Sequence, residues 1–362
     1  MSAAQPRSFG VEEEFVLIDP ATRQVASRSG RAEAANESGE EVALELFQHQ
    51  VESSTPPLRD AGELGEALRR GRRAMGESAA AAGARAVATA SPPLPPEAQQ
   101  FTRAPRYLRF ETEYGQIARD AHVCGMHVHV EVSDDEQGVH VIDGIRPWLP
   151  LLTAISANSP YWLGRDSGYA SWRSRVWRQW PSTGPREPFG DVATYREVAD
   201  RSIAWGGAMD KAMLYFDVRL AENYPTVELR VADVCLEVED AVLIAVLTRA
   251  LVETHASEPV DAWRADLLNV AAWRAARYGI GGDLVHPGTR ELASAREVLG
   301  SLAEHVGQAL DATGERRFVQ DGFERLLARG NGAVRQRRTF EETHDLVAVV
   351  DDLADATEAT WL

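Results

Sequence analysis

The 362-residue sequence contains very little lysine and very little cysteine. Lys211 is the only lysine, so binding of anions must depend on arginine, whose charge is fixed and whose geometry is bidentate. Two cysteines, Cys124 and Cys235, are too few for a disulfide framework or a four-thiolate zinc site. We therefore interpret both as small buried hydrophobic residues.

Positive charge and long apolar runs are also scarce. A formal net charge of -17 argues against a nucleic-acid-binding surface, which needs clustered basic side chains. The start, MSAAQPRSFG, lacks the apolar core of a signal peptide. The most apolar stretch, 241–252, contains Arg249 and is shorter than the roughly 20 residues that cross a bilayer. We expect a cytoplasmic protein without a membrane span.

Hydrophobic periodicity predicts both strands and helices. Alternation predicts strands at 9–18, 84–90, 122–132, 213–220 and 226–232, and proline-rich 91–99 is predicted to be a loop. Helices are predicted at 60–82, 106–121, 143–157, 192–206, 237–255, 262–278, 290–312 and 339–356. With no repeat or long linker, the sequence predicts one α+β domain over 1–362 with a mainly helical C-terminal third.

The first predicted strand carries a pair of carboxylates. Residues i and i+2 of a strand share a face, so Glu12 and Glu14 lie side by side while Glu13 points away. Two adjacent anions repel each other unless a cation lies between them, and hard oxygen ligands suit Mg²⁺ or Mn²⁺. Taken alone, the pattern fits a solvated acidic edge strand equally well.

Two further strands repeat the i, i+2 pattern. His127 and His129 share one face of their strand, and Glu228 shares a face with Arg230. Ordinary hydrogen-bonded histidines and a cross-strand ion pair are the competing interpretations. A glutamate ligand beside an arginine is also what a transferring phosphoryl group requires. The coincidence of three such strands favours a metal site, to which Glu52 of ELFQHQVES adds a further carboxylate.

These segments, together with NSPYWLGRDSGYASWRSRVW and AAWRAARYGIGGDLVHP, resemble the type 2 glutamate-cysteine ligase family of bacterial carboxylate-amine ligases. The resemblance covers most of the chain and follows the family's order. It implies a glutamine-synthetase-like antiparallel sheet with flanking helices. It also implies ATP and Mg²⁺, or Mn²⁺, as cofactors, small carboxylate and amine substrates, and a homo-oligomer.

The resemblance also assigns roles to individual residues. Glu12, His127 and Glu228 are expected to bind one divalent ion, and Glu14 and Glu52 another, with room for a third ion. His129 and Arg230 are expected to approach the ATP phosphates, and Glu228 and Arg230 are the expected catalytic residues. Further arginines in family-like segments are assigned to substrate (Arg173 and Arg175) and to a phosphate or carboxylate (Arg335); for Arg173 and Arg175, stacking on tryptophans is the competing interpretation.

The predicted reaction is phosphorylation of a carboxylate, with glutamate as the expected donor, followed by attack of an amine on the acyl phosphate. Cysteine is one candidate amine, although Cys124 and Cys235 carry no information about it. A zinc hydrolase is disfavoured because the sequence has no helical His-Glu-x-x-His pattern. A metal-dependent amide hydrolase built on the same sheet and a non-catalytic nucleotide-binding regulator remain alternatives.

Overall fold

The computed structural model describes residues 5–95 and 100–362. Its centre is an antiparallel sheet whose strands lie in the order β2 (Ala43–Leu44), β3 (Gln50–Ser54), β1 (Phe9–Ile18), β5 (Gly125–Glu131), β9 (Thr226–Asp233) and β8 (Val218–Leu220). A short strand, β4 (Arg85–Val87), pairs with the far end of β1. This arrangement confirms the predicted α+β class. Residues 96–99 of the predicted loop lie outside the described part of the chain.

The register of the central strands aligns the predicted polar residues. Glu14 of β1 stands opposite Glu52 of β3, and Glu12 stands opposite His127 of β5. Further along, His129 of β5 stands opposite Glu228 of β9. Directly opposed residues of an antiparallel pair share a face of the sheet, so these side chains all lie on one face.

The pairing of β5 with β9 is interrupted by a β-bulge. Met126 pairs with Ala232, but Val128 pairs with Leu229, so two residues of β9, Arg230 and Val231, stand opposite His127. A bulge of this kind shifts the alternation of the strand and redirects its side chains. As a result Asp233, which pairs with Gly125, lies on the same face as Glu228.

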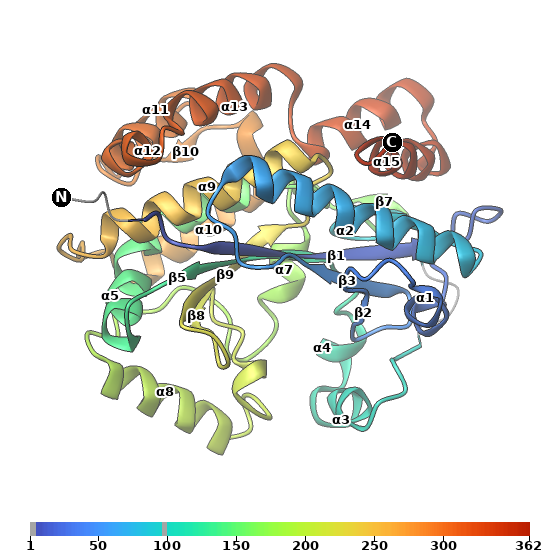
Figure 1. Ribbon diagram of the computed structural model, residues 1–362, viewed down its shortest axis with the longest axis horizontal. Helices are drawn as coiled ribbons and strands as arrows, with labels where there is room; N and C mark the ends of the chain where they lie inside the picture. The colour runs from blue at the N-terminus through green and yellow to red at the C-terminus, as the bar shows by residue number, and fades with distance from the viewer. Residues whose placement is uncertain (1–4, 96–99) are drawn as a thin grey trace.

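Two helices, α2 (Ala61–Ala81) and α9 (Val238–His255), cover the opposite face of the sheet (Figure 1). Val11, Val128 and Leu229 are buried in the large hydrophobic cluster that includes much of α9. At the centre of the sheet these apolar residues therefore face α2 and α9, whereas Glu12, His129 and Glu228 face away from them. This division follows from the period of two in the strand sequences.

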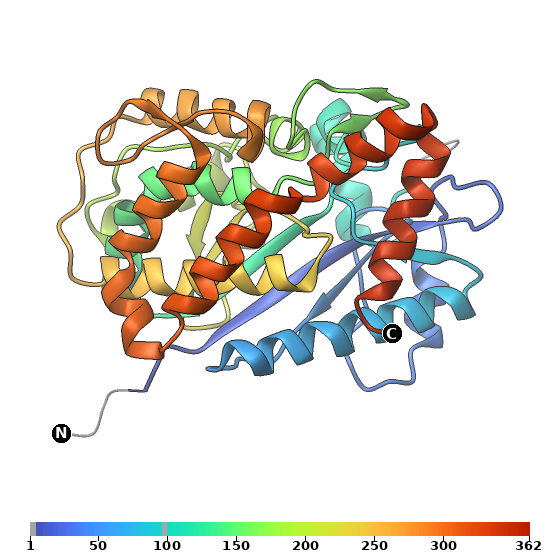
Figure 2. The ribbon, with the colours of Figure 1, turned by 90° about the horizontal axis from the view of Figure 1, so that it is seen from above.

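Further helices form an outer layer beyond α2 and α9. Figure 2 shows these C-terminal helices, in orange and red, lying over the sheet and its first helical layer. The outer helices are α11 (Ala295–His305), α12 (Gly307–Thr313), α13 (Arg316–Arg329), α14 (Gly332–Thr343) and α15 (Leu346–Ala359). The C-terminus ends against α2, where Arg73 donates a hydrogen bond to the carbonyl of Trp361. The predicted helical character of the C-terminal third is confirmed.

The remaining elements are shorter or lie at the rim of the sheet. The helices are α1 (Ser29–Ala35), α3 (Pro105–Tyr114), α4 (Gln116–Arg119), α5 (Asp135–Ile145), η1 (Arg146–Trp148), α6 (Leu149–Ser156), α7 (Arg173–Trp177), α8 (Val192–Ala204), η2 (Lys211–Met213), α10 (Ala265–Tyr278) and η3 (Gly279–Gly281). Two small hairpins pair β6 (Tyr161–Trp162) with β7 (Arg165–Asp166) and β10 (Leu284–Val285) with β11 (Leu292–Ala293). None of the described helices is both long and apolar enough to cross a membrane.

Several predicted boundaries were wrong for identifiable reasons. The predicted helix 106–121 is divided into α3 and α4 by Gly115, whose φ of 54° lies in the left-handed region. The helix predicted at 143–157 is preceded by α5, and Pro147 at the start of η1 separates α5 from α6. Helices α1 and α13 were not predicted, and the range 290–312 contains a short strand and two helices instead of one helix.

Glu13 is a carboxylate on the apolar face of β1, where it forms a buried ion pair. It is buried against Arg72 of α2, which donates from Nε at 2.9 Å and from Nη2 at 2.5 Å. Arg72 also donates to the carbonyls of Cys235 and Leu236, which follow β9. This ion pair joins β1, α2 and the end of β9, and it confirms that Glu13 points away from Glu12 and Glu14. Cys124 and Cys235 are buried free thiols, as predicted.

Candidate functional site

Glu12 is at the centre of the polar face of the sheet. One of its carboxylate oxygens lies 3.0 Å from His127 Nδ1, and the other lies 3.2 Å from His129 Nε2. His127 Nε2 lies 4.0 Å from a carboxylate oxygen of Glu14. Four of the predicted site residues thus contact one another across two strands, because the register places Glu12 beside His127.

The ligand atoms of this face fall into three overlapping groups, each with its atoms within 4.8 Å of one another. The groups are Glu12, His129 and Glu228; Glu12, Glu52 and His127; and Glu14, Glu45 and Glu52. The structure thus brings together every residue predicted as a metal ligand, but it places His129 rather than His127 in the group with Glu12 and Glu228. It also adds Glu45, which was not predicted as a ligand.

These residues fit divalent cations chemically. Five carboxylates and two imidazoles converge, and such oxygen-rich sets suit Mg²⁺ or Mn²⁺. His127 Nε2 is buried and has no hydrogen-bond partner in the described part of the chain. A buried imidazole nitrogen without a partner, facing carboxylates, is an arrangement that an ion would satisfy.

Crowding of carboxylates changes how they ionise. Burial, the charge of Glu14 and the charge of Glu12 raise the pKa of Glu45 to about 8. Burial and the charge of Glu45 likewise raise the pKa of Glu52 well above its usual range. Both shifts favour the protonated carboxyl groups at this end of the cluster. Binding of a metal ion there would be accompanied by release of protons.

At the other end of the cluster, guanidinium groups stabilise ionised carboxylates. Burial opposes ionisation of Glu228, but the charges of Arg230 and Arg219 outweigh burial and lower its pKa. Arg219 of β8 donates to both oxygens of Glu228, at 2.6 Å and 3.1 Å, and Arg230 donates to one of them. Arg219 also donates to the carbonyl of Ala212, which holds its side chain in place.

Arg219 was not among the residues predicted from the sequence. It stands directly opposite Glu228 in the pairing of β8 with β9. The only signal in the sequence was that 213–220 was predicted as a strand, and the pairing partner of a strand cannot be deduced from its own residues. Arg219 therefore becomes a candidate site residue only with the sheet register known.

Arg173 lies at the Glu14 end of the face and is 2% exposed. Its Nη2 donates to the carbonyl of Arg230 at 3.3 Å, and its Nη1 lies 4.0 Å from Asp233. Its guanidinium covers Gly125, because a Cβ atom at that position would lie only 2.2 Å from Nη2. The glycine at the start of β5 is therefore required for the close approach of this arginine.

Asp233 fixes the segment that carries Arg173. Its carboxylate accepts hydrogen bonds from the Ser159 hydroxyl at 2.7 Å and the Ser171 hydroxyl at 2.8 Å, and from the backbone amide of Asn158 at 2.9 Å. Arg173 also lies over the ring of Trp177, with 5.6 Å to its centroid. Both interpretations of Arg173 thus have structural support, since it stacks on tryptophan and still has a buried Nε without a partner among the described residues.

A cavity next to the cluster is rich in arginine. Arg173, Arg175, Arg178 and Arg230 all line it. Among the described residues that line it, Asp217 is the only acidic one, and it is paired with Arg178 at 3.0 Å. Burial and the neighbouring Arg178 lower the pKa of Arg175 to about 10. A cavity with several arginines and one carboxylate is suited to an anionic ligand.

Arg335 is not brought to this site. It lies on α14, where it donates to both oxygens of Asp352 at 2.9 Å and 2.8 Å, and 3.5 Å from Glu237. Figure 1 places α14 and α15 on the helical side of the sheet, opposite the polar face. Its assignment to a phosphate or carboxylate stays a prediction that this geometry does not support.

Comparison with known proteins supports the same fold and family. A solved bifunctional glutathione synthetase from Pasteurella multocida superposes with a TM-score of 0.71 at 16% identity, over 99% of this chain and 53% of that one. The chain thus spans about half of that enzyme. A glutamate–cysteine ligase from Francisella tularensis, solved in complex with AMP, gives a TM-score of 0.64 at 12% identity, over 99% of this chain and 89% of that one.

Comparison of sequences identifies the family, which the comparison of folds does not. The relatives of this chain by sequence are named as ligases. A relative from Nocardioides sp. with the provisional name glutamate–cysteine ligase 2-1 is 46% identical over 98% of this chain and 97% of its own length. The model of glutamate-cysteine ligase family 2 matches residues 8–352, and the chain belongs to that family.

Proposed function

We propose that this protein is an ATP-dependent carboxylate-amine ligase that uses glutamate as the carboxylate donor, with cysteine as the first candidate amine. The observation that carries the proposal is the polar face of the sheet, where three groups of ligand atoms meet two arginines. The glutamate–cysteine ligase of similar fold was solved with AMP bound, which supports use of an adenine nucleotide here.

Two or three Mg²⁺ ions would be held by the three ligand groups, and when bound they neutralise phosphate charge. Glu12 belongs to two of the groups and Glu52 to two, so these carboxylates would bridge neighbouring positions. Glu14 and Glu45 complete the group farthest from Arg230.

Arg230 is the residue proposed to stabilise the phosphoryl group during transfer. The bulge in β9 places it opposite His127, and it is 7% exposed. Charge develops on the phosphoryl oxygens in the transition state, and a fixed buried guanidinium stabilises that charge without reorganising. Arg219 holds Glu228 from the other side and thereby positions it.

The substrate carboxylates would enter from the side of the arginine-rich cavity. Arg173 and Arg175 line it together with Arg230, so an α-carboxylate bound there lies close to the proposed phosphoryl site. The γ-carboxylate oxygen would attack the γ-phosphorus, the bond to ADP would break, and an acyl phosphate would form. The amine would then attack the acyl carbon and release phosphate, which leaves an amide.

The decisive experiment supplies ATP, Mg²⁺ and glutamate with a panel of amines, measures ADP, and identifies the products by mass spectrometry. We expect ADP and phosphate in a one-to-one ratio with an amide. Amine-independent ADP levels with every acceptor would refute the ligase. AMP and pyrophosphate as products would refute the acyl phosphate. Cleavage of amides without ATP would favour the hydrolase instead.

A homo-oligomer in the cytoplasm is also proposed, on family resemblance alone. Light scattering of the purified protein and fractionation of producing cells test these two points. A monomer at assay concentrations would refute the first, and recovery outside the cytoplasm would refute the second.

A further inference from the structure

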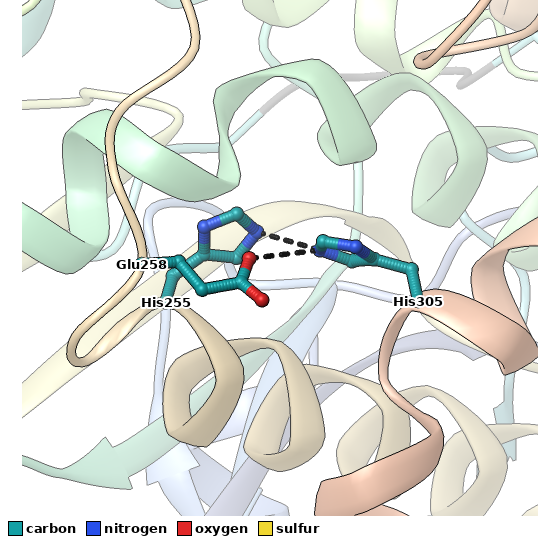
Figure 3. A group of neighbouring side chains, drawn as sticks. All are labelled: His255, Glu258 and His305. Atoms are coloured by element: carbon teal, nitrogen blue, oxygen red, sulfur yellow. Dashed lines mark hydrogen bonds and ion pairs between the residues drawn. The ribbon is translucent and has the colours of Figure 1, made fainter.

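A second cluster of imidazoles and a carboxylate lies where two helices end. His255 is the last residue of α9, His305 is the last residue of α11, and Glu258 follows α9 by three residues (Figure 3). The three ligand atoms lie within 4.8 Å of one another. None of these residues takes part in the ligase site proposed above.

The distances within this cluster fit a tetrahedral metal ion. His255 Nε2 and His305 Nε2 are 3.0 Å apart, and a Glu258 oxygen lies 3.9 Å from His305 Nε2. Ligand atoms at about 2.0–2.1 Å from a tetrahedral zinc ion are roughly 3.3 Å apart. The two observed separations lie on either side of this value, so only small side-chain movements are needed.

The electrostatic surroundings favour a cation. The C-terminal end of a helix carries partial negative charge, and two such ends meet here, one of 18 residues and one of 11. Burial, together with the neighbouring imidazoles of His305 and His140, lowers the pKa of His255 to about 4, which keeps its lone pair free. Neutral imidazole is the form that binds metals.

The packing around the cluster holds the ligands in place. The ring of Trp148 stacks on His305 with 4.4 Å between centroids, and His140 Nε2 lies 2.8 Å from the carbonyl oxygen of Glu258. His255 is buried, whereas the side chains of His305 and Glu258 are 24% and 46% exposed. An ion can therefore reach the ligands from solvent.

We propose that His255, Glu258 and His305 bind a transition-metal ion of the zinc type, with water as the fourth ligand, and that this ion joins the C-terminal ends of α9 and α11. Imidazole nitrogen prefers zinc and related ions to Mg²⁺, so the two sites of the protein would select different metals. The alternative is a hydrogen bond between two neutral imidazoles with no ion.

The test measures bound zinc after dialysis against Zn²⁺ with excess Mg²⁺ present throughout, so that the carboxylate-rich sheet is occupied. Glu258→Gln is the main variant because its side chain is half exposed and its loss should not prevent folding. His305→Gln is the second variant. We expect each variant to retain one equivalent of zinc less than the wild type, because the affinity of this site for zinc should fall roughly 100-fold. Loss of even an outer-shell partner of a metal ligand costs about 10–100-fold in affinity.

Two controls isolate the site. His344→Asn changes an exposed histidine with left-handed backbone, which Asn tolerates, and should keep full zinc binding. Glu228→Gln alters the carboxylate cluster on the sheet and should also keep the equivalent of zinc bound by His255, Glu258 and His305. Added zinc should raise the thermal midpoint of the wild type but not of Glu258→Gln. Equal zinc content and equal midpoints in wild type, Glu258→Gln and His305→Gln would overturn the proposal and leave the imidazole hydrogen bond.

Discussion

Neighbouring glutamates on the two faces of β1 have opposite surroundings. Glu13, on the side of α2, is 2% exposed and is fully matched by the guanidinium of Arg72. Glu12 and Glu14, on the other side, face imidazoles and further carboxylates instead. The sequence VEEEF shows three equal acids, and only their surroundings distinguish them.

The difference separates a structural carboxylate from one available for binding. Glu13 lies in a fully buried ion pair with Arg72, and none of the groups of ligand atoms among the described residues includes it. Carboxylates that crowd against each other instead keep their lone pairs and gain from a cation. A second contrast lies within the cluster itself, where Arg230 and Arg219 lower the pKa of Glu228, whereas burial and neighbouring carboxylates raise the pKa of Glu45 to about 8.

Replacement of Glu228 by Gln should have the largest effect. We expect activity to fall roughly 10³-fold, because a ligand of the proposed phosphoryl site is lost while Arg219 and Arg230 stay in place. Steady-state ADP release as a function of Mg²⁺ concentration measures both the fall in activity and the metal dependence. Glu131→Gln, near the exposed end of the neighbouring strand, is the matched control and should stay near wild type. Near-normal turnover and metal dependence would remove Glu228 from the metal site.

Arg72→Met tests the structural face. It leaves Glu13 buried without its partner, so the free energy of unfolding should fall by about 3–5 kcal/mol. Urea denaturation measures this loss, which Mg²⁺ should not restore. The double variant Glu13→Leu with Arg72→Met should recover most of it, whereas Arg70→Ala, which breaks an exposed ion pair, should cost at most about 1 kcal/mol. A loss as small as that of Arg70→Ala would contradict the comparison.

The pH dependence of the metal-free protein should report the protonated end of the cluster. Glu45 has a pKa of about 8 when folded and 4.5 as its ordinary value, so the folded chain holds a proton that the unfolded chain has lost. Stability from this group is therefore greatest below pH 4.5 and is lost as pH rises towards 8. The thermal midpoint should fall by roughly 2–5 °C over that window.

Mg²⁺ and one variant sharpen this measurement. Excess Mg²⁺ should raise the midpoint more at pH 8 than at pH 5, since binding displaces the proton. Glu45→Gln should flatten the decline in the metal-free protein. A midpoint that rises with pH in the metal-free wild type would show that the carboxylates of this group are already ionised.

Arg335→Ala should have the smallest effect. The variant loses a half-exposed ion pair with Asp352, which contributes about 1 kcal/mol or less. The KM for ATP should stay within about threefold of wild type, because the side chain lies away from the polar face. Steady-state kinetics with varied ATP measure it, and a KM raised more than tenfold would return Arg335 to the nucleotide site.

Alternation alone was enough to predict β1 and the shared face of Glu12 and Glu14. Phe9–Ile18 was predicted to the residue, because a strand with one polar and one buried face has a strict period of two. The fold class followed in the same way, with family resemblance supplying the type of sheet. The same period correctly separated Glu13 from its neighbours.

Residues that depend on strand order and on irregular segments could not be predicted. Arg72 contacts Glu13, 59 residues away, and Arg219 contacts Glu228 through the pairing of β8 with β9. Local patterns encode neither the packing partner nor the register. Glu45 lies just after the two-residue strand β2, where no periodicity marks its direction. Arg335 illustrates the opposite error, since a family-like run of glycine and arginine does not fix where a helix packs.

The bulge in β9 divides that strand into two segments whose alternation is out of phase. Glu228 and Asp233 are five positions apart, which on a regular strand would send them to opposite sides of the sheet. The extra residue cancels this parity, so one strand supplies Glu228 to the carboxylate cluster and Asp233 to the loop that carries Arg173. The spacing between the proposed metal and substrate subsites is thus set by the length of a single strand, and any insertion or deletion between these two residues would uncouple them.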